Sequence, residues 1–328
     1  MNVAVVGLGF GKNHVQALTE MDFVQDIAIC DLDKNLLKQV AKKADIDYKT
    51  DDYKEILADD NIDALTLAVP HNLHAEMIKQ AIEAEKHVYC EKPLTTTLSA
   101  GKKIVEFASD RGIKITAGFN MRYYEQYQKA KDLITEGKLG NIFLVECFAR
   151  ADARGIGGFR LSKEKAGGGC LIDSGAHRFD LLRWLFGPFN SIYNSMGNFV
   201  LDNMGGEDTA VVNIKFADDI IANLICSWAT VTPEWDEGMK IYGTKGSISI
   251  WDHNLSLSWL KKGGKEKTFK YTTSYEDTVG ISLYNFLNEV KKGNLKIDKA
   301  RALSHLQAIE ASYKSAAGNQ VIELKNLI

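Results

Sequence analysis

The sequence has few of the features that mark a chain as disordered, secreted or membrane-spanning. It contains only 4 prolines among 328 residues, and its 45% hydrophobic and 25% charged residues are typical of a packed globular protein. No apolar run approaches the roughly 18 residues that a membrane-spanning helix needs. No internal repeat or low-complexity segment is present. The chain is long for one domain and comfortable for two.

Cysteine usage and net charge exclude further classes of protein. The 5 cysteines are odd in number and form no CxxC pair, so we expect neither a disulfide framework nor a metal site. A formal net charge of −3 favours neither nucleic acid nor an anionic membrane as a partner. Residues 2–6 are already apolar enough for a buried strand, which leaves no room for a signal peptide. We therefore expect a cytoplasmic protein with reduced cysteines.

Two parts of the chain differ in the spacing of their apolar residues. Over residues 1–120, short apolar runs alternate with amphipathic segments, which is typical of a parallel, doubly wound sheet with helices on both faces. Over residues 121–328, apolar and polar residues alternate within successive strands, which favours a large, mostly antiparallel open sheet with one covered face. We therefore predict an α/β domain over 1–120 and an α+β domain over 121–328.

The expected elements follow from these patterns. In the first domain we expect strands at 2–6, 26–30, 64–69, 87–90 and 113–117, and helices at 11–20, 33–43, 73–84 and 97–110. In the second domain we expect a helix at 122–136, a strand at 142–148, a helix that Ser174 caps, and helices at 277–292 and 298–317. Its remaining strands are expected at 189–200, 208–216, 219–229, 238–243, 246–251, 255–260 and 266–272, before a short final strand.

A glycine-rich turn follows the first expected strand. In Gly7-Leu8-Gly9-Phe10-Gly11, the third glycine comes one residue earlier than in the GxGxxG pattern, and Lys12 holds its place. Glycines at such a turn let a pyrophosphate approach the backbone N–H groups at a helix N-terminus. We interpret the turn as a dinucleotide site, and a purely structural turn is the alternative.

Two other strand ends carry candidate cofactor contacts. Asp31 ends the second expected strand, where a carboxylate accepts hydrogen bonds from a ribose and repels a 2′-phosphate, so NAD is favoured over NADP. Lys34 keeps NADP open as an alternative. After the third strand, Pro70, Asn72 and His74 are expected beside the nicotinamide, with a turn and an Asn helix cap as the alternative. We assign no role to His14.

Acid–base residues occur in two further segments. A flexible triple glycine, Gly167-Gly168-Gly169, precedes Asp173 and His177, which we expect one turn apart on the same face of a helix. At Glu91-Lys92-Pro93, the proline holds the preceding lysine in an extended conformation. These residues indicate acid–base chemistry beside a nucleotide. A helix cap with a buried histidine is the alternative for Asp173 and His177.

The chain resembles the glucose–fructose oxidoreductase / inositol dehydrogenase / MocA (Gfo/Idh/MocA) family of nicotinamide-dependent oxidoreductases. Matching elements occur in the family order along nearly the whole chain. They are the glycine turn at 7–11, the segment 69–74, Glu91-Lys92-Pro93, the segment 117–123, Phe159-Arg160, the GGxxxDxGxHxxD segment at 168–180, and the segments 242–247 and 310–315. The shortened glycine turn and Phe159, where many members have Trp, depart from the family pattern.

The resemblance implies a Rossmann domain that holds the dinucleotide and a C-terminal α+β domain that forms the substrate pocket. Lys92, Asp173 and His177 occupy the family's catalytic positions. Histidine, with an ordinary pKa of about 6.5, is suited to take the hydroxyl proton of an alcohol near neutral pH. Lys92 would polarise the oxygen. The cofactor contacts are then expected from Gly7, Gly9, Phe10, Gly11, Asp31, Pro70, Asn72, His74, Glu91, Lys92 and Arg160.

A polyol substrate fits the remaining polar candidates. Asn120, Arg122, Asp173 and His177 are expected to bind a sugar, a sugar derivative or a cyclitol, with a salt-bridged arginine as the alternative for Arg122 and Arg160. Asp180 is either structural or a substrate contact. The run from Trp228 to Trp235, with Glu234, Asp236 and Glu237, is either a pocket rim or an exposed loop. An NAD-dependent elimination or glycosidic cleavage and a non-catalytic NAD(P) sensor are the rival functions. We expect a homodimer or homotetramer that forms through the second sheet.

Overall fold

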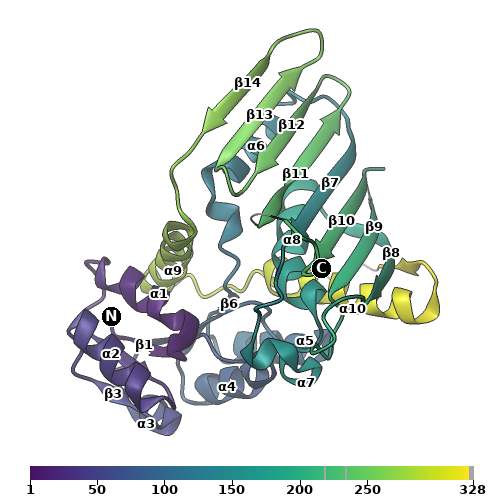
Figure 1. Ribbon diagram of the computed structural model, residues 1–328. Helices are drawn as coiled ribbons and strands as arrows, with labels where there is room; N and C mark the ends of the chain where they lie inside the picture. Colours follow the sequence, from purple (N-terminus) through teal and green to yellow (C-terminus); the bar gives the residue numbers. More distant parts are fainter. Residues whose placement is uncertain (218, 233–234, 325–328) are drawn as a thin grey trace. The chain divides into compact units, whose positions relative to one another are not determined.

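The computed structural model describes residues 1–217, 219–232 and 235–324, and the chain forms two compact units (Figure 1). Unit 1 comprises Met1–Asn120 and Tyr275–Leu303, and unit 2 comprises Met121–Ser274 and Ser304–Ile328. Glu234 lies outside the described residues, and Trp235 beside it is half exposed. Among the described residues, no helix combines the length and the apolar character needed to cross a bilayer.

Unit 1 is built on a parallel sheet, as predicted, and this sheet has six strands where five were expected. The strands lie in the order β3-β2-β1-β4-β5-β6. Their bounds are β1 Val3–Val6, β2 Ile27–Cys30, β3 Lys49–Thr50, β4 Ala64–Leu67, β5 His87–Cys90 and β6 Ile115–Ala117. The connecting helices are α1 Leu8–Thr19, α2 Lys34–Ala44, α3 Tyr53–Ala58, α4 His71–Glu83 and α5 Leu98–Asp110. Strand β3 and helix α3, of 2 and 6 residues, were not predicted from the sequence.

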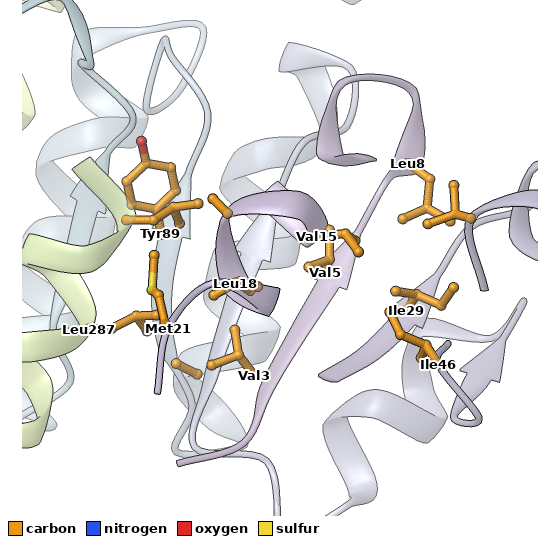
Figure 2. Close-up of a cluster of buried hydrophobic side chains, with 14 of the residues drawn as sticks. Val3, Val5, Leu8, Val15, Leu18, Met21, Ile29, Ile46, Tyr89 and Leu287 are labelled. Carbon is orange, nitrogen blue, oxygen red and sulfur yellow. The ribbon is translucent and has the colours of Figure 1, made fainter. Parts of the chain in front are cut away.

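The core of unit 1 joins its two chain segments. Figure 2 shows Val3 and Val5 of β1 and Leu18 of α1 packed in one apolar cluster with Tyr89 of β5 and Leu287 of α9. Helix α9 (Tyr275–Lys291) also packs along α1. The predicted division at residue 120 placed this helix in the second domain. Its apolar face instead completes the core of unit 1.

Unit 2 contains the predicted large, mostly antiparallel sheet. Its nine strands lie in the order β14-β13-β12-β11-β7-β10-β9-β8-β15, and only β7 and β10 pair in parallel. Their bounds are β7 Ile142–Arg150, β8 Phe189–Gly197, β9 Thr209–Phe216, β10 Ile221–Ser227, β11 Asp236–Gly243, β12 Gly246–Trp251, β13 Ser256–Lys261, β14 Glu266–Lys270 and β15 Ile322–Glu323. The helices of this part are α6 Glu125–Thr135, α7 Lys163–Ala166, α8 Cys170–Phe186 and, from Ser304 on, α10 (Lys299–Gly318), which begins in unit 1; short 3-10 turns lie at Met121–Tyr123 and Gly158–Leu161.

Helix α8 begins earlier than predicted. Its N-cap is Gly169, so Ser174 lies inside the helix, where its hydroxyl accepts a hydrogen bond from Trp228 Nε1 at 2.9 Å. The triple glycine is also not flexible. A Cβ atom at Gly168 would overlap the Tyr313 hydroxyl, and a Cβ atom at Gly169 would overlap the backbone of Glu207. These two glycines are therefore fixed by close packing.

Candidate active site

The candidate cofactor residues of unit 1 lie at one edge of its sheet. Strand β1 pairs with β2 on one side and β4 on the other, so its carboxyl end is a point at which the strand order reverses. Gly7, Asp31 and Glu91 directly follow β1, β2 and β5, and Pro70 follows β4 by two residues more. Because the strands are parallel, these segments lie along the same edge, where open α/β sheets bind ligands.

The shortened glycine turn has close contacts that exclude a side chain at Gly7 and leave little room for one at Gly11. Gly7 has φ +85°, and a Cβ atom there would lie 2.5 Å from the Ala68 carbonyl oxygen. A Cβ atom on Gly11 would lie 3.0 Å from Val5 Cγ1, so Gly11 provides the close helix–strand packing one residue early. Gly9 faces open space within the described part of the chain. The N-terminus of α1 therefore fits a dinucleotide pyrophosphate.

Asp31 stabilises the glycine turn. Its Oδ2 accepts a hydrogen bond from Leu8 N at 2.6 Å, and its Oδ1 accepts one from Asp33 N at 2.8 Å. Lys34, the residue that kept NADP open, forms an ion pair with Asp51 at 2.8 Å between Nζ and Oδ2. This carboxylate competes with any phosphate for the lysine.

The segment after β4 does not use Asn72 as a helix cap. Helix α4 begins at His71 with Pro70 as its N-cap, and Asn72 is exposed in the first turn. The ring of His74 is fully buried, and its nitrogens contact the carbonyl oxygens of Val69 at 2.9 Å and Pro93 at 2.7 Å. Burial lowers the pKa of His74 below its ordinary value. We therefore interpret His74 as a link between two loops of the site rather than as a ligand contact.

His14 is a residue of this edge that the sequence analysis missed. Its Nε2 lies 3.0 Å from Glu91 Oε1, and its Nδ1 lies 3.1 Å from Thr66 Oγ1. The ring is fully buried and packs edge-on against Phe10 and Tyr89. Lys92 is 9% exposed, and its bond to Pro93 is cis. His14 thus connects the first helix to the segment that carries Glu91 and Lys92.

Asn120 ends the first segment of unit 1. Its side chain is 1% exposed, and Nδ2 donates a hydrogen bond to Thr278 Oγ1 at 2.8 Å. Its Oδ1 has no hydrogen-bond partner among the described residues. The Oδ1 atom of Asn120 can therefore still accept a hydrogen bond, for example from a ligand hydroxyl.

In unit 2, Asp173 and His177 lie on α8, and each is 6% exposed. Arg160 donates a hydrogen bond from Nε to Asp173 Oδ2 at 2.6 Å, and its expected contact with the cofactor stays a prediction. Its guanidinium group also lies over the Phe159 ring at 4.9 Å. Asp173 therefore lies in the first turn of α8 with the Arg160 guanidinium group beside it.

Arg122, a predicted substrate contact, forms a two-point ion pair with Asp180. Its Nε lies 2.6 Å from Oδ2, and its Nη2 lies 2.5 Å from Oδ1. The Asp180 side chain is only 2% exposed, and the Arg122 side chain is 13% exposed. Both arginines thus form ion pairs in the structure, and their expected contacts with the cofactor and the substrate stay predictions. Each fixes a carboxylate of α8.

A buried ionic network surrounds Arg178 of α8, and no sequence motif indicated it. Arg178 is fully buried, and its Nη1 lies 2.7 Å from Asp252 Oδ2 and 2.9 Å from the Tyr127 hydroxyl. Its Nη2 lies 3.0 Å from Glu237 Oε2. Through these partners α8 is tied to α6, β11 and the end of β12. Among the described residues, no group of three or more His, Cys, Asp or Glu is arranged to hold a metal ion.

Comparison with known proteins identifies both parts of the chain. Residues 1–119 match the family described as an oxidoreductase family with an NAD-binding Rossmann fold, and residues 127–249 match the GFO/IDH/MocA C-terminal domain. An uncharacterized oxidoreductase of Synechocystis sp., sll0816, is 33% identical over 273 residues, which cover 78% of this chain and 72% of that protein. Myo-inositol 2-dehydrogenase of Thermotoga maritima is 26% identical and covers 89% of each chain.

Solved structures share the fold. Levoglucosan dehydrogenase, in a complex with NADH and levoglucosan, superposes with a TM-score of 0.91 at 23% identity and covers 99% of this chain and 100% of that chain. At this identity the likeness concerns the fold. Both sheets described above are therefore those of a known two-domain architecture.

Proposed function

The chain belongs to the Gfo/Idh/MocA family of oxidoreductases, and from that membership we propose that it is an NAD(P)-dependent dehydrogenase of a sugar, sugar derivative or cyclitol. The observation that carries this proposal is the pair Asp173 and His177 on one helix, with Asp173 held by Arg160. Oxidation of a secondary alcohol removes a hydride from carbon and a proton from oxygen, and leaves a ketone. The pair is suited to the proton.

The residues that would hold the dinucleotide are those at the edge of the parallel sheet. The turn Gly7–Gly11 would bind the pyrophosphate, and Asp31 would bind the adenosine ribose, which favours NAD over NADP. Asn72, Glu91 and Lys92 would line the nicotinamide end. When bound, the nicotinamide supplies the hydride acceptor.

The protein's own residues would handle the proton and the substrate. His177 accepts the hydroxyl proton on a ring nitrogen, and Asp173 orients or charge-stabilises it. Lys92 is a cation for the substrate oxygen. Asn120, through its Oδ1, would accept a hydrogen bond from a substrate hydroxyl. Relatives named for myo-inositol, scyllo-inositol and levoglucosan support a polyol as the substrate class.

The proposal is tested by NADH formation in purified protein with NAD or NADP and a panel of sugars, sugar acids and inositols. We expect NADH with one substrate class and a preference for NAD. No NADH with any polyol, together with NAD binding by calorimetry, would overturn the dehydrogenase proposal. Product analysis would then separate the elimination reaction, which forms product without net NADH, from a sensor, which forms none.

Replacement of the proposed base separates binding from chemistry. We expect His177→Ala to lose about 10²–10⁴-fold in kcat, the usual contribution of a positioned acid–base group, while calorimetry shows unchanged NAD affinity. The exposed His253→Ala is the matched control and should keep full activity. Turnover of His177→Ala within a few-fold of the parent would contradict the general-base role.

A further inference from the structure

The N-terminus of α8 is held by a residue outside the predicted site. The first backbone N–H groups of a helix have no acceptor within the helix, and the N-cap Gly169 has no side chain to supply one. Glu207, from the segment before β9, supplies the acceptors instead. Its Oε2 accepts from Gly169 N at 3.1 Å, its Oε1 accepts from Leu171 N at 3.0 Å, and its carbonyl oxygen accepts from Cys170 N at 2.9 Å.

Tyr313 of α10 completes the arrangement. Its hydroxyl donates to Glu207 Oε1 at 3.0 Å. Glu207 is 7% exposed, and burial raises the pKa of its carboxyl group, while the hydrogen bonds from Leu171, Tyr313 and Gly169 oppose that rise. The Tyr313 hydroxyl and the Glu207 backbone also occupy the space beside Gly168 and Gly169. Three segments far apart in the sequence therefore meet at the start of α8.

We propose that Glu207 and Tyr313 are positioning residues that fix the first turn of α8 and thereby the placement of Asp173 and His177. This inference rests on the proposed function, because it assigns the two residues an effect on proton transfer. Asp173 lies four residues after the cap and His177 lies eight residues after it. Fraying or a shift of the first turn therefore moves Asp173 directly, and it moves His177 along the axis of the same helix. Misplacement by about 1 Å can cost about 10²-fold in rate.

A neighbouring carboxylate provides a matched control. Asp208 is also buried, and its Oδ2 accepts hydrogen bonds from Phe199 N at 3.0 Å, Val200 N at 2.7 Å and Leu201 N at 2.9 Å. It therefore holds a loop of its own segment and not α8. Asp208→Asn removes the same charge one residue away and affects three backbone donors of that loop, whereas Glu207→Gln affects two backbone donors at the start of α8.

The kinetic test compares Glu207→Gln, Tyr313→Phe and Asp208→Asn with the active substrate from the panel. We expect kcat to fall about 10²-fold in Glu207→Gln, because the Gln amide has one oxygen and cannot accept from both Gly169 N and Leu171 N. We expect a several-fold fall in Tyr313→Phe, because Phe lacks the hydroxyl that donates to Glu207. KM and NAD affinity should change less than three-fold. Losses in Asp208→Asn equal to those in Glu207→Gln, or a KM change without a kcat change, would overturn the proposal.

Amide hydrogen exchange tests the same inference without activity. We expect exchange at Cys170 and Leu171 to quicken at least ten-fold in Glu207→Gln and to stay unchanged in Asp208→Asn. Unchanged exchange in Glu207→Gln would overturn the positioning role even if the enzyme is active. Faster exchange in a protein without dehydrogenase activity would instead uphold the link between Glu207 and α8 and reject the proposed function.

Discussion

His14 joins two segments of unit 1 that are 77 residues apart in the sequence. The Nε2 atom of His14 lies 3.0 Å from Glu91 Oε1 and its Nδ1 atom lies 3.1 Å from Thr66 Oγ1, so both ring nitrogens have a polar partner. The consequence is a fixed carboxylate on the residue that precedes Lys92.

Two amide replacements of His14 separate its two hydrogen bonds. The Gln amide nitrogen can reach the position of Nε2, whereas the Asn amide reaches only the position of Nδ1. We therefore expect His14→Gln to stay within about three-fold of the parent and His14→Asn to lose about ten-fold in kcat/KM, the effect of one lost charge-assisted hydrogen bond. Calorimetric NAD affinity and steady-state kinetics provide the measurement. Equal losses in both variants would argue against a specific effect through Glu91.

Residue types and spacing could predict which residues belong to the candidate site, but not which of them form hydrogen bonds with one another. The positions of Asp173 and His177 on one helix followed from sequence spacing alone. The roles of Arg160 and Arg122 did not, because their carboxylate partners lie 13 and 58 residues away. His14 was assigned no role, because a histidine on a helix is more often packed or solvated than a ligand, and its partners Thr66 and Glu91 lie 52 and 77 residues away.

At the scale of elements, the stability of α8 depends on one buried cation, Arg178. Arg178 is fully buried against Asp252, Glu237 and Tyr127. Removal of the guanidinium group leaves two carboxylates beside an apolar core, which is costly even where the intact network adds little stability. Loss of an exposed cation should therefore destabilise α8 less than loss of Arg178.

A matched pair of methionine variants measures that dependence. We expect Arg178→Met to lower the free energy of unfolding of unit 2 by about 3–5 kcal/mol. Lys131→Met removes another link to α8, the hydrogen bond from Nζ to the Trp184 carbonyl oxygen at 2.8 Å, and should cost only about 1 kcal/mol. All 5 tryptophans lie between residues 184 and 259, so tryptophan fluorescence in urea follows unit 2 alone. Similar losses in both variants would contradict the argument.

Element prediction succeeded where periodicity ran over several turns or strand residues. The long helices and most strands follow the expected ranges, and both sheet types are confirmed. Short elements such as β3, α3 and α7 were missed because two to six residues define no period. The start of α8 was misplaced because Glu207, rather than a side chain at the local N-cap, supplies the acceptors.

At the scale of the whole molecule, one face of the nine-stranded sheet is covered by helix α8, which packs on β7, β9 and β10. Alternate residues of β10 are buried beneath it, whereas Ile221 and Ile225 point to the opposite face, and Ile221 is 56% exposed. In register with Ile225 lie Phe148 of β7 and Val211 of β9. Besides the exposed Ile221, this face carries the partly exposed Ile225 and Val211, apolar side chains that association would bury.

We therefore propose a homodimer or homotetramer that forms through this face, with sedimentation or light scattering as the measurement. The parent protein should have a mass of at least twice 36.4 kDa. Ile225→Glu places a charge at the centre of the face and should shift the protein toward the monomer. Leu73→Glu alters an exposed apolar residue of α4 in unit 1 and should leave the assembly intact. A parent mass near 36.4 kDa would reject the proposal.

Because the chain returns to unit 1 only at α9, part of the core of this unit is synthesised late. The core around Leu18 and Tyr89 lacks the side chains of α9 until residues 275–291 have left the ribosome. By then the polypeptide of both sheets, except β15, has been made. A nascent chain of about 120 residues therefore exposes the apolar surface of α1, and it is in this interval that holding chaperones have a binding site.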